Sequence, residues 1–175
     1  MRLLNFTYAA YDHLLSLLKY NNYKISNYEN YLYNDKCVIL RHDVDFSLEA
    51  ALQFAELECK EGIQSTYFIL LATPFYNPFH RKSRFIVEAI RDMGHDIGLH
   101  FDEANYLISN KEELINYVER EIAILSNGLN MKIKSVSMHR PSKWVLEEDV
   151  QFKSGINSYS SIFFNDFKYL SDSRM

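Results

Sequence analysis

The stretch Val38-Ile39-Leu40-Arg41-His42-Asp43-Val44-Asp45 decides the fold that the sequence predicts. Its apolar first half is typical of a buried strand, and its polar residues follow where we expect that strand to leave the sheet. Because side chains alternate along a strand, Asp43 and Asp45 should point to one side, with His42 and Val44 on the other. Two carboxylates together there favour a bound cation, and ligands of α/β proteins bind at that end of the sheet.

Composition indicates one globular domain with a sizeable core, since 47% of the 175 residues are hydrophobic and 15% are aromatic. The formal net charge of −4 argues against a nucleic-acid partner, because such proteins usually carry a basic face. No stretch reaches the ~18 apolar residues of a membrane helix, and the N-terminal residues do not follow a secretory pattern. We therefore expect a cytoplasmic protein. Cys37 and Cys59 lack metal or redox spacing and are predicted to be buried free thiols.

Strands and helices alternate from residue 38 to about residue 138, and the region after it is less regular. Helical spacing of apolar residues and capping signals predict helices over 7–19, 47–62, 83–93 and 110–127. Apolar runs predict strands at 38–40, 66–71, 96–99 and 135–138, with further strands at 162–164 and 168–170. This alternation predicts an α/β fold of parallel strands joined by right-handed crossovers.

Three of the predicted strands end in polar residues, namely Arg41–Asp45, His100–Asp102 and His139-Arg140. Parallel strands end on the same face, so these side chains should converge. Two Asp residues with histidines suit a divalent-metal hydrolase, because zinc binds imidazole nitrogen and carboxylate oxygen and leaves a position for water. A second carboxylate can take the proton of that water, and a nearby Arg can orient it. A histidine outside the metal shell can protonate a leaving amine.

Structural interpretations of the same residues stay open beside the functional one. Asp45 can cap the helix that follows it, although for Asp43 and Asp45 together function is favoured. His95 follows a helix-ending glycine and is better explained as a satisfied structural histidine. Arg140 fits loop geometry equally well, since the following proline favours an extended conformation. The aromatic residues at 75–79 fit core cover as well as a sugar platform.

The motifs resemble those of the polysaccharide deacetylases of the NodB-homology superfamily, most closely its branch with an Arg-His-Asp-Val-Asp opening. The resemblance runs through Val38–Ser47, Ser65–Phe68, Gly94–Phe101, His139–Pro141 and Tyr169–Ser173. It implies a distorted (β/α) barrel of about seven parallel strands with flanking helices. It also implies metal-dependent removal of an N- or O-acetyl group from a sugar.

The resemblance assigns roles by position. Asp43 corresponds to the catalytic base, Asp45 to the metal-binding Asp, His100 to the first metal histidine and Arg140 to the Arg that tethers the base. The second metal histidine of the family falls four residues after the first, where this chain has Ala104. Asp102 is a candidate substitute.

The chain is also shorter than the whole barrel of that family. The late Leu-x-His motif, whose histidine acts as an acid, has no match. We therefore expect residues 1–175 to be a single deacetylase-like domain truncated at its C-terminus, an incomplete (β/α) barrel with an open sheet edge. A partner chain or a missing C-terminal segment would complete it.

Our first hypothesis is a hydrolase that acts on the carbon–nitrogen bond of an acetylated sugar in a cell-surface polysaccharide or its precursor. It predicts a divalent metal, zinc first, bound by Asp45, His100 and Asp102, with Asp43, Arg140 and His139 as the catalytic residues. The alternative is a non-catalytic sugar-binding or assembly protein on the same fold with a degenerate metal site, suggested by Ala104 and the missing late histidine. A helix-rich adaptor is disfavoured, because it leaves the charged strand ends unexplained.

Overall fold

The computed structural model of the chain describes residues 7–31 and 36–170, apart from the side chain of Phe164. Residues 171–173, which belong to the last segment of the family resemblance, lie outside the described residues. None of the helices in the described part of the chain combines the length and apolar character needed to cross a bilayer.

Five parallel strands form the main sheet in the order β3-β4-β5-β6-β7. They are β3 (Arg41–Val44), β4 (Thr66–Leu70), β5 (Asp96–Asp102), β6 (Ser135–His139) and β7 (Ile156–Asn157). Each strand is therefore the sheet neighbour of the next strand in the chain, as in a barrel that winds in one direction. The predicted α/β fold, with its parallel strands and flanking helices in the form of an incomplete barrel, is confirmed.

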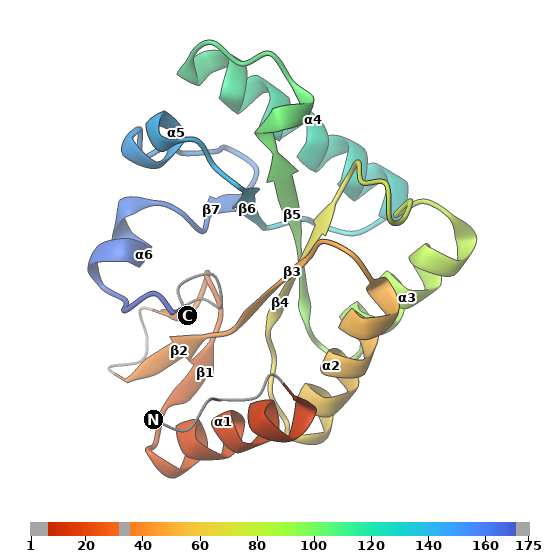
Figure 1. Cartoon of the computed structure of the whole chain (residues 1–175), viewed down its shortest axis with the longest axis vertical. Helices are drawn as coiled ribbons and strands as arrows, with labels where there is room; N and C mark the ends of the chain where they lie inside the picture. The colour runs from red at the N-terminus through yellow and green to blue at the C-terminus, as the bar shows by residue number, and fades with distance from the viewer. Residues whose placement is uncertain (1–6, 32–35, 171–175) are drawn as a thin grey trace.

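Four longer helices flank the sheet along one side (Figure 1). They are α1 (Tyr8–Tyr20), α2 (Leu48–Lys60), α3 (Arg81–Asp92) and α4 (Lys111–Leu129). Thr7, Ser47 and Asn110 cap helices α1, α2 and α4, each side-chain oxygen accepting from a backbone N–H in the first turn. The short helices α5 (Lys143–Glu147) and α6 (Ser161–Asn165) lie on the opposite side.

The chain enters the main sheet differently from the prediction. The predicted strand at 38–40 is divided at Leu40, where β2 (Cys37–Ile39) ends. β2 pairs with β1 (Lys24–Ser26) in a separate parallel ribbon. The polar residues that follow do not merely end a strand. They form β3 themselves, because their backbone pairs with Thr66–Ile69 of β4.

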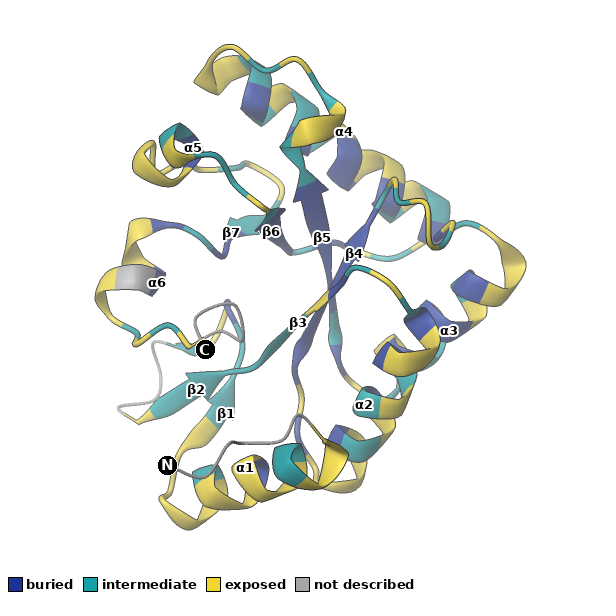
Figure 2. Cartoon of the chain, viewed as in Figure 1, coloured by how far each residue is buried: buried dark blue, intermediate teal, exposed yellow. Residues whose placement is uncertain are grey.

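Burial is greatest in the middle of the sheet. Every residue of β4 is buried, and β5 is buried except at its two ends (Figure 2). The edge strands β3 and β7 are less covered. Large side chains with under 2% exposure, such as Ile90, Leu99 and Leu125, form the core with the packed faces of the helices. A continuous apolar strand between covered faces is the pattern of a parallel sheet.

The C-terminal part departs most from the sequence prediction. Residues 162–164 lie in helix α6 and not in a strand, and 168–170 form no strand. The Asp149 carboxylate accepts from the Ser161 N–H at 2.8 Å and from its hydroxyl at 2.7 Å, which fixes the start of that helix. The fifth strand of the sheet is β7, a two-residue segment too short to stand out in the sequence.

Two local predictions also need correction. Helix α4 does not stop at Asn127-Gly128 but continues to Leu129, and Asn130 ends it in the left-handed conformation with φ 52°. Gly128 serves packing instead, since a Cβ there would lie 2.2 Å from the Phe79 ring. Both cysteines are free thiols as predicted, but Cys59 is exposed and Cys37 is only half-buried.

Candidate metal centre

Asp45, His100 and His139 converge at the carboxyl ends of β3, β5 and β6. Three potential ligand atoms, one from each residue, lie within 4.8 Å of one another. His100 Nε2 is 3.2 Å from Asp45 Oδ1, and His139 Nδ1 is 3.4 Å from the same oxygen. The two imidazole nitrogens are 3.1 Å apart. Parallel strand ends thus gather these side chains at one point, as the sequence indicated.

The hydrogen bonds around the group suit a cation. His100 is 2% exposed, and its Nδ1 lies 3.2 Å from the carbonyl oxygen of Ser137. If Nδ1 carries the proton and donates it there, Nε2 presents its lone pair, an arrangement typical of metal-binding histidines. Asp45 Oδ1 is buried and accepts no hydrogen bond from the described residues. A buried carboxylate oxygen facing two imidazole nitrogens fits a bound divalent ion.

Charges near Asp45 favour its ionised form. The neighbouring His100 imidazole holds the pKa of the Asp45 carboxyl below its ordinary value, burial acts in the opposite direction, and the charges of His139 and Arg140 add to the lowering. An ionised carboxylate is the form that binds a metal ion.

Asp43 lies beside the group and is held by Arg41. The Arg41 guanidinium donates to both carboxylate oxygens through Nη2, at 2.8 Å to Oδ1 and 2.5 Å to Oδ2. It also donates to Ser137 Oγ and, at 3.1 Å, to Ser158 Oγ. Asp43 Oδ2 is 4.0 Å from His100 Nε2. The carboxylate is therefore fixed next to the metal-ligand group without belonging to it.

His42, the residue between Arg41 and Asp43, points to the other face of β3 as predicted. Its Nε2 lies 2.8 Å from Glu58 Oε1, and its ring stacks on Tyr67 with centroids 4.7 Å apart. Glu58 is fully buried and also accepts from Ser65 at 2.6 Å, from Tyr67 at 2.7 Å and from Tyr11. Buried polar side chains thus fix the reverse face of the strand that carries both carboxylates.

Burial raises the pKa of Glu58, but the hydrogen bonds and the His42 imidazole outweigh it and bring the pKa down to about 2. His95, on the same side, is the structural histidine that the sequence indicated. Its Nδ1 accepts from the Ser65 N–H at 3.2 Å, and its Nε2 lies 3.1 Å from the carbonyl oxygen of Ala55.

Two candidate residues lie elsewhere than expected. Asp102 is not part of the metal-ligand group, because its Oδ1 accepts from the Ala104 N–H at 3.1 Å and caps a 3₁₀ turn, Glu103–Asn105. Arg140 is exposed, and the guanidinium bonded to Asp43 is that of Arg41. The signal for Arg41 is its position two residues before Asp43, which places both on one face of the strand. His139 lies in the group of potential metal ligands. The sequence instead predicted it to be a catalytic residue outside the metal shell.

The aromatic loop after β4 divides into two parts. Tyr76 fastens it to the sheet, donating to the Val44 carbonyl at 2.6 Å and accepting from the Leu70 N–H at 3.0 Å. Phe75 is 58% exposed and packs edge-on against Phe46, itself 63% exposed, with centroids 4.7 Å apart. The loop therefore serves both as core cover and as an exposed aromatic pair next to Asp45.

Comparison with solved structures identifies the same fold. The chain aligns with the Streptococcus pyogenes deacetylase PplD, solved in complex with acetate, at a TM-score of 0.58 and 13% identity. The alignment covers 78% of this chain and 65% of PplD, so the chain spans about two thirds of that protein. No protein-family model matches the sequence, and no curated protein matches it.

A CE4 family pseudoenzyme from Bacillus anthracis aligns with a TM-score of 0.47 at 17% identity, covering 60% of this chain and 36% of that one. A mutant of the same pseudoenzyme with restored enzymatic activity gives 0.48 at 17% identity, covering 62% and 38%. The alignment with PplD confirms the deacetylase type of fold that the motifs implied.

Proposed function

We propose that this chain, which has the fold of the polysaccharide deacetylases, is a metal-dependent hydrolase that removes an acetyl group from a sugar of a cell-surface polysaccharide or its precursor. The observation that carries the proposal is the grouping of Asp45, His100 and His139 within 4.8 Å, with the Asp43 carboxylate held beside it by Arg41.

Asp45, His100 and His139 would hold the metal ion. One oxygen and two nitrogen donors suit zinc, which in catalytic sites takes three protein ligands. Such an ion lowers the pKa of a water molecule and polarises a carbonyl group. His139 thereby replaces Asp102 as the third proposed metal ligand.

Asp43 is the proposed base. It takes a proton from the water whose oxygen attacks the acetyl carbonyl carbon, and it returns that proton to the leaving nitrogen when the carbon–nitrogen bond breaks. The products are acetate and a free amino sugar. Arg41 keeps the carboxylate oriented through both transfers, because its two hydrogen bonds restrict rotation of the side chain.

The non-catalytic alternative rested on Ala104, which stands where a second metal histidine was expected, and on the missing late histidine. A third donor from His139, supplied by a different strand, supports an intact metal site and so favours the hydrolase.

Purified protein tests the proposal directly. Wild-type protein should contain about one equivalent of zinc and should release acetate from N-acetylglucosamine oligomers, and a chelator should abolish the release. Asp43→Asn should keep the zinc and lose about 10²–10⁴-fold in rate. Asp92→Asn, at an exposed position at the end of α3, is the matched control and should behave like the wild type. Folded protein with neither zinc nor acetate release would refute the proposal.

A further inference from the structure

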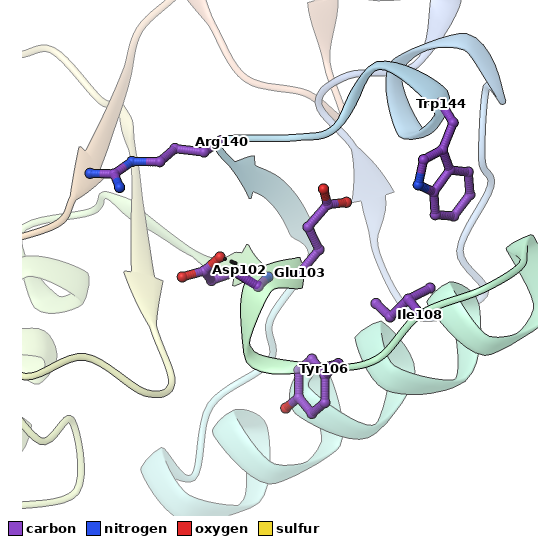
Figure 3. A pocket seen from close by; sticks show the side chains of 7 residues that line it. Asp102, Glu103, Tyr106, Ile108, Arg140 and Trp144 are labelled. Atoms are coloured by element: carbon purple, nitrogen blue, oxygen red, sulfur yellow. Dashed lines mark hydrogen bonds between the residues drawn. The ribbon is translucent and has the colours of Figure 1, made fainter.

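A cavity of about 260 Å³ lies beside the candidate metal centre. The pocket is lined from the end of β5 and the segment after it by Asp102, Glu103, Ala104 and Tyr106, and from the segment after β6 by Arg140 and Trp144. Figure 3 shows Glu103 between Arg140 and the Trp144 ring, with Tyr106 and Ile108 below. None of the steps proposed for deacetylation uses the Trp144 ring or Glu103.

This pocket lies directly beside the group of potential metal ligands. Asp102 is the register partner of His139 across the β5–β6 pair, and Arg140 directly follows His139. Arg140 has a φ of 49°, a conformation that is costly for a residue with a Cβ. In Figure 3 its side chain extends away from Trp144.

The side chains around the cavity combine an aromatic face with hydrogen-bond acceptors. Glu103 Oε1 accepts from the Ser142 N–H at 2.7 Å, and Asp102 Oδ1 accepts from the Ala104 N–H. One oxygen of each carboxylate is thus used structurally, and the second can accept from ligand hydroxyls. A half-buried indole offers an apolar face for a sugar ring.

We infer that this pocket binds one pyranose ring of the glycan, the unit next to the sugar whose acetyl group is removed. The ring packs on Trp144, and its hydroxyls donate to Asp102 and Glu103. The carboxylates of Asp102 and Glu103 make the lining negative where the sugar hydroxyls bind, so the pocket selects a neutral or cationic sugar over an acidic one. This inference rests on the proposed function, since it takes the acetylated unit to lie at the metal centre.

Trp144 is the only tryptophan of the chain, so fluorescence excited at a wavelength that tyrosine does not absorb reports on the surroundings of this indole. Asp43→Asn protein with its metal bound, which turns over slowly, is titrated with N-acetylglucosamine, with its tetramer and with a uronic acid tetramer. The N-acetylglucosamine tetramer should produce a saturable change, the monosaccharide a weaker affinity and the uronic acid tetramer no change. Absence of a saturable change with the N-acetylglucosamine tetramer would overturn the inference.

Ala104→Phe places a ring in the pocket, and Asn105→Phe places the same ring at the adjacent exposed position that does not line it. The first should weaken tetramer affinity by about tenfold or more, and the second should leave it within about twofold. Equal effects of the two variants would contradict the inference.

Failure of the deacetylase proposal would look different. In that case zinc and acetate release are missing from the wild type, whatever the fluorescence shows. If only the subsite is wrong, wild-type protein releases acetate, and Ala104→Phe affects the tetramer and the monosaccharide substrate to the same extent.

Discussion

Arg41 and Asp43 lie on the same face of β3, and the Arg41 Nη2 atom is bonded to both oxygens of the Asp43 carboxylate, at 2.8 and 2.5 Å. The same guanidinium reaches Ser137 on β6 and Ser158 after β7. One side chain therefore connects an edge strand to the far part of the curved sheet. The orientation of the proposed base depends on this connection.

Arg41→Lys should reduce turnover by about 10–10²-fold, because a single ammonium group cannot reproduce the planar guanidinium contacts to Asp43 and both serines. Bound zinc should be unchanged, since Arg41 is not in the ligand group. Rates of acetate release and metal content on the same samples check this. Arg84→Lys, in an exposed pair with Glu88, is the control and should retain full activity. Equal activity of both variants would show that Arg41 does not orient the base.

His139→Ala should lower zinc affinity by at least about 10²-fold, because it removes one of three donors. Asp102→Asn should leave zinc affinity unchanged, as an amide oxygen can still cap the 3₁₀ turn. Competition with a chelating dye measures both constants. The opposite ranking would restore Asp102 as the third ligand.

Glu58→Gln should lower the free energy of unfolding at pH 7 by about 3 kcal/mol, because the hydrogen bonds and the His42 imidazole that bring the Glu58 pKa down to about 2 stabilise the ionised carboxylate of the folded protein. A depressed acid pKa contributes stability that is present above about pH 4.5 and is lost as the pH falls towards 2. Denaturant unfolding of wild type and variant at pH 7 and pH 3 should show their difference shrinking at the lower pH. A difference independent of pH would rule out this role.

Glu121 is the matched buried carboxylate, 2% exposed and accepting from Tyr106. Burial raises its pKa to about 7, so its contribution has the opposite sign. That contribution is fully present below about pH 4.5 and is lost as the pH rises through 7. Glu121→Gln keeps the acceptor for Tyr106 and should not destabilise the protein at pH 8, unlike Glu58→Gln.

Gly98→Ala should destabilise the protein by about 1–3 kcal/mol, because a Cβ at this position of β5 would lie 2.4 Å from the Phe68 ring and 2.9 Å from Ser135 Oγ. Gly155→Ala is the control, since the nearest atoms there are at 3.4 Å. Thermal unfolding of both variants measures the difference. Similar melting temperatures would mean that Phe68 can move aside.

The sequence predicts strands β4, β5 and β6 of the main sheet and most of the helices, because their apolar runs and caps are local signals. It places the first strand at 38–40, where the structure has the separate β1–β2 ribbon, and not at β3. The alternation of Asp43 and Asp45 against His42 also follows from strand geometry alone, and the structure confirms it. The region after β6 was misassigned. Its two-residue strand β7 and helix α6 depend on contacts such as that between Asp149 and Ser161, which link positions twelve residues apart.

The sequence predicts where the candidate metal site lies more accurately than it predicts which residues form it. Parallel strand ends place Asp45, His100 and His139 on one face, but which third residue approaches the other two depends on register between strands. Asp102 and His139 are register partners, and the backbone turn after β5 decides that Asp102 caps a 3₁₀ turn while His139 faces Asp45 and His100. Arg41 was missed as the partner of Asp43 because the family resemblance pointed to Arg140.

The bond between His100 Nδ1 and the Ser137 carbonyl crosses from one strand to the next. Donor atoms from three separate strands can meet only after those strands have paired in register, so an unfolded or partly folded chain offers no tight site. Zinc at about 100 times its dissociation constant would then stabilise the folded protein by about 2.7 kcal/mol. Metal scarcity would accordingly reduce the amount of folded protein as well as its catalytic rate. The amount of zinc bound per protein molecule would then measure the fraction of a preparation that is correctly folded.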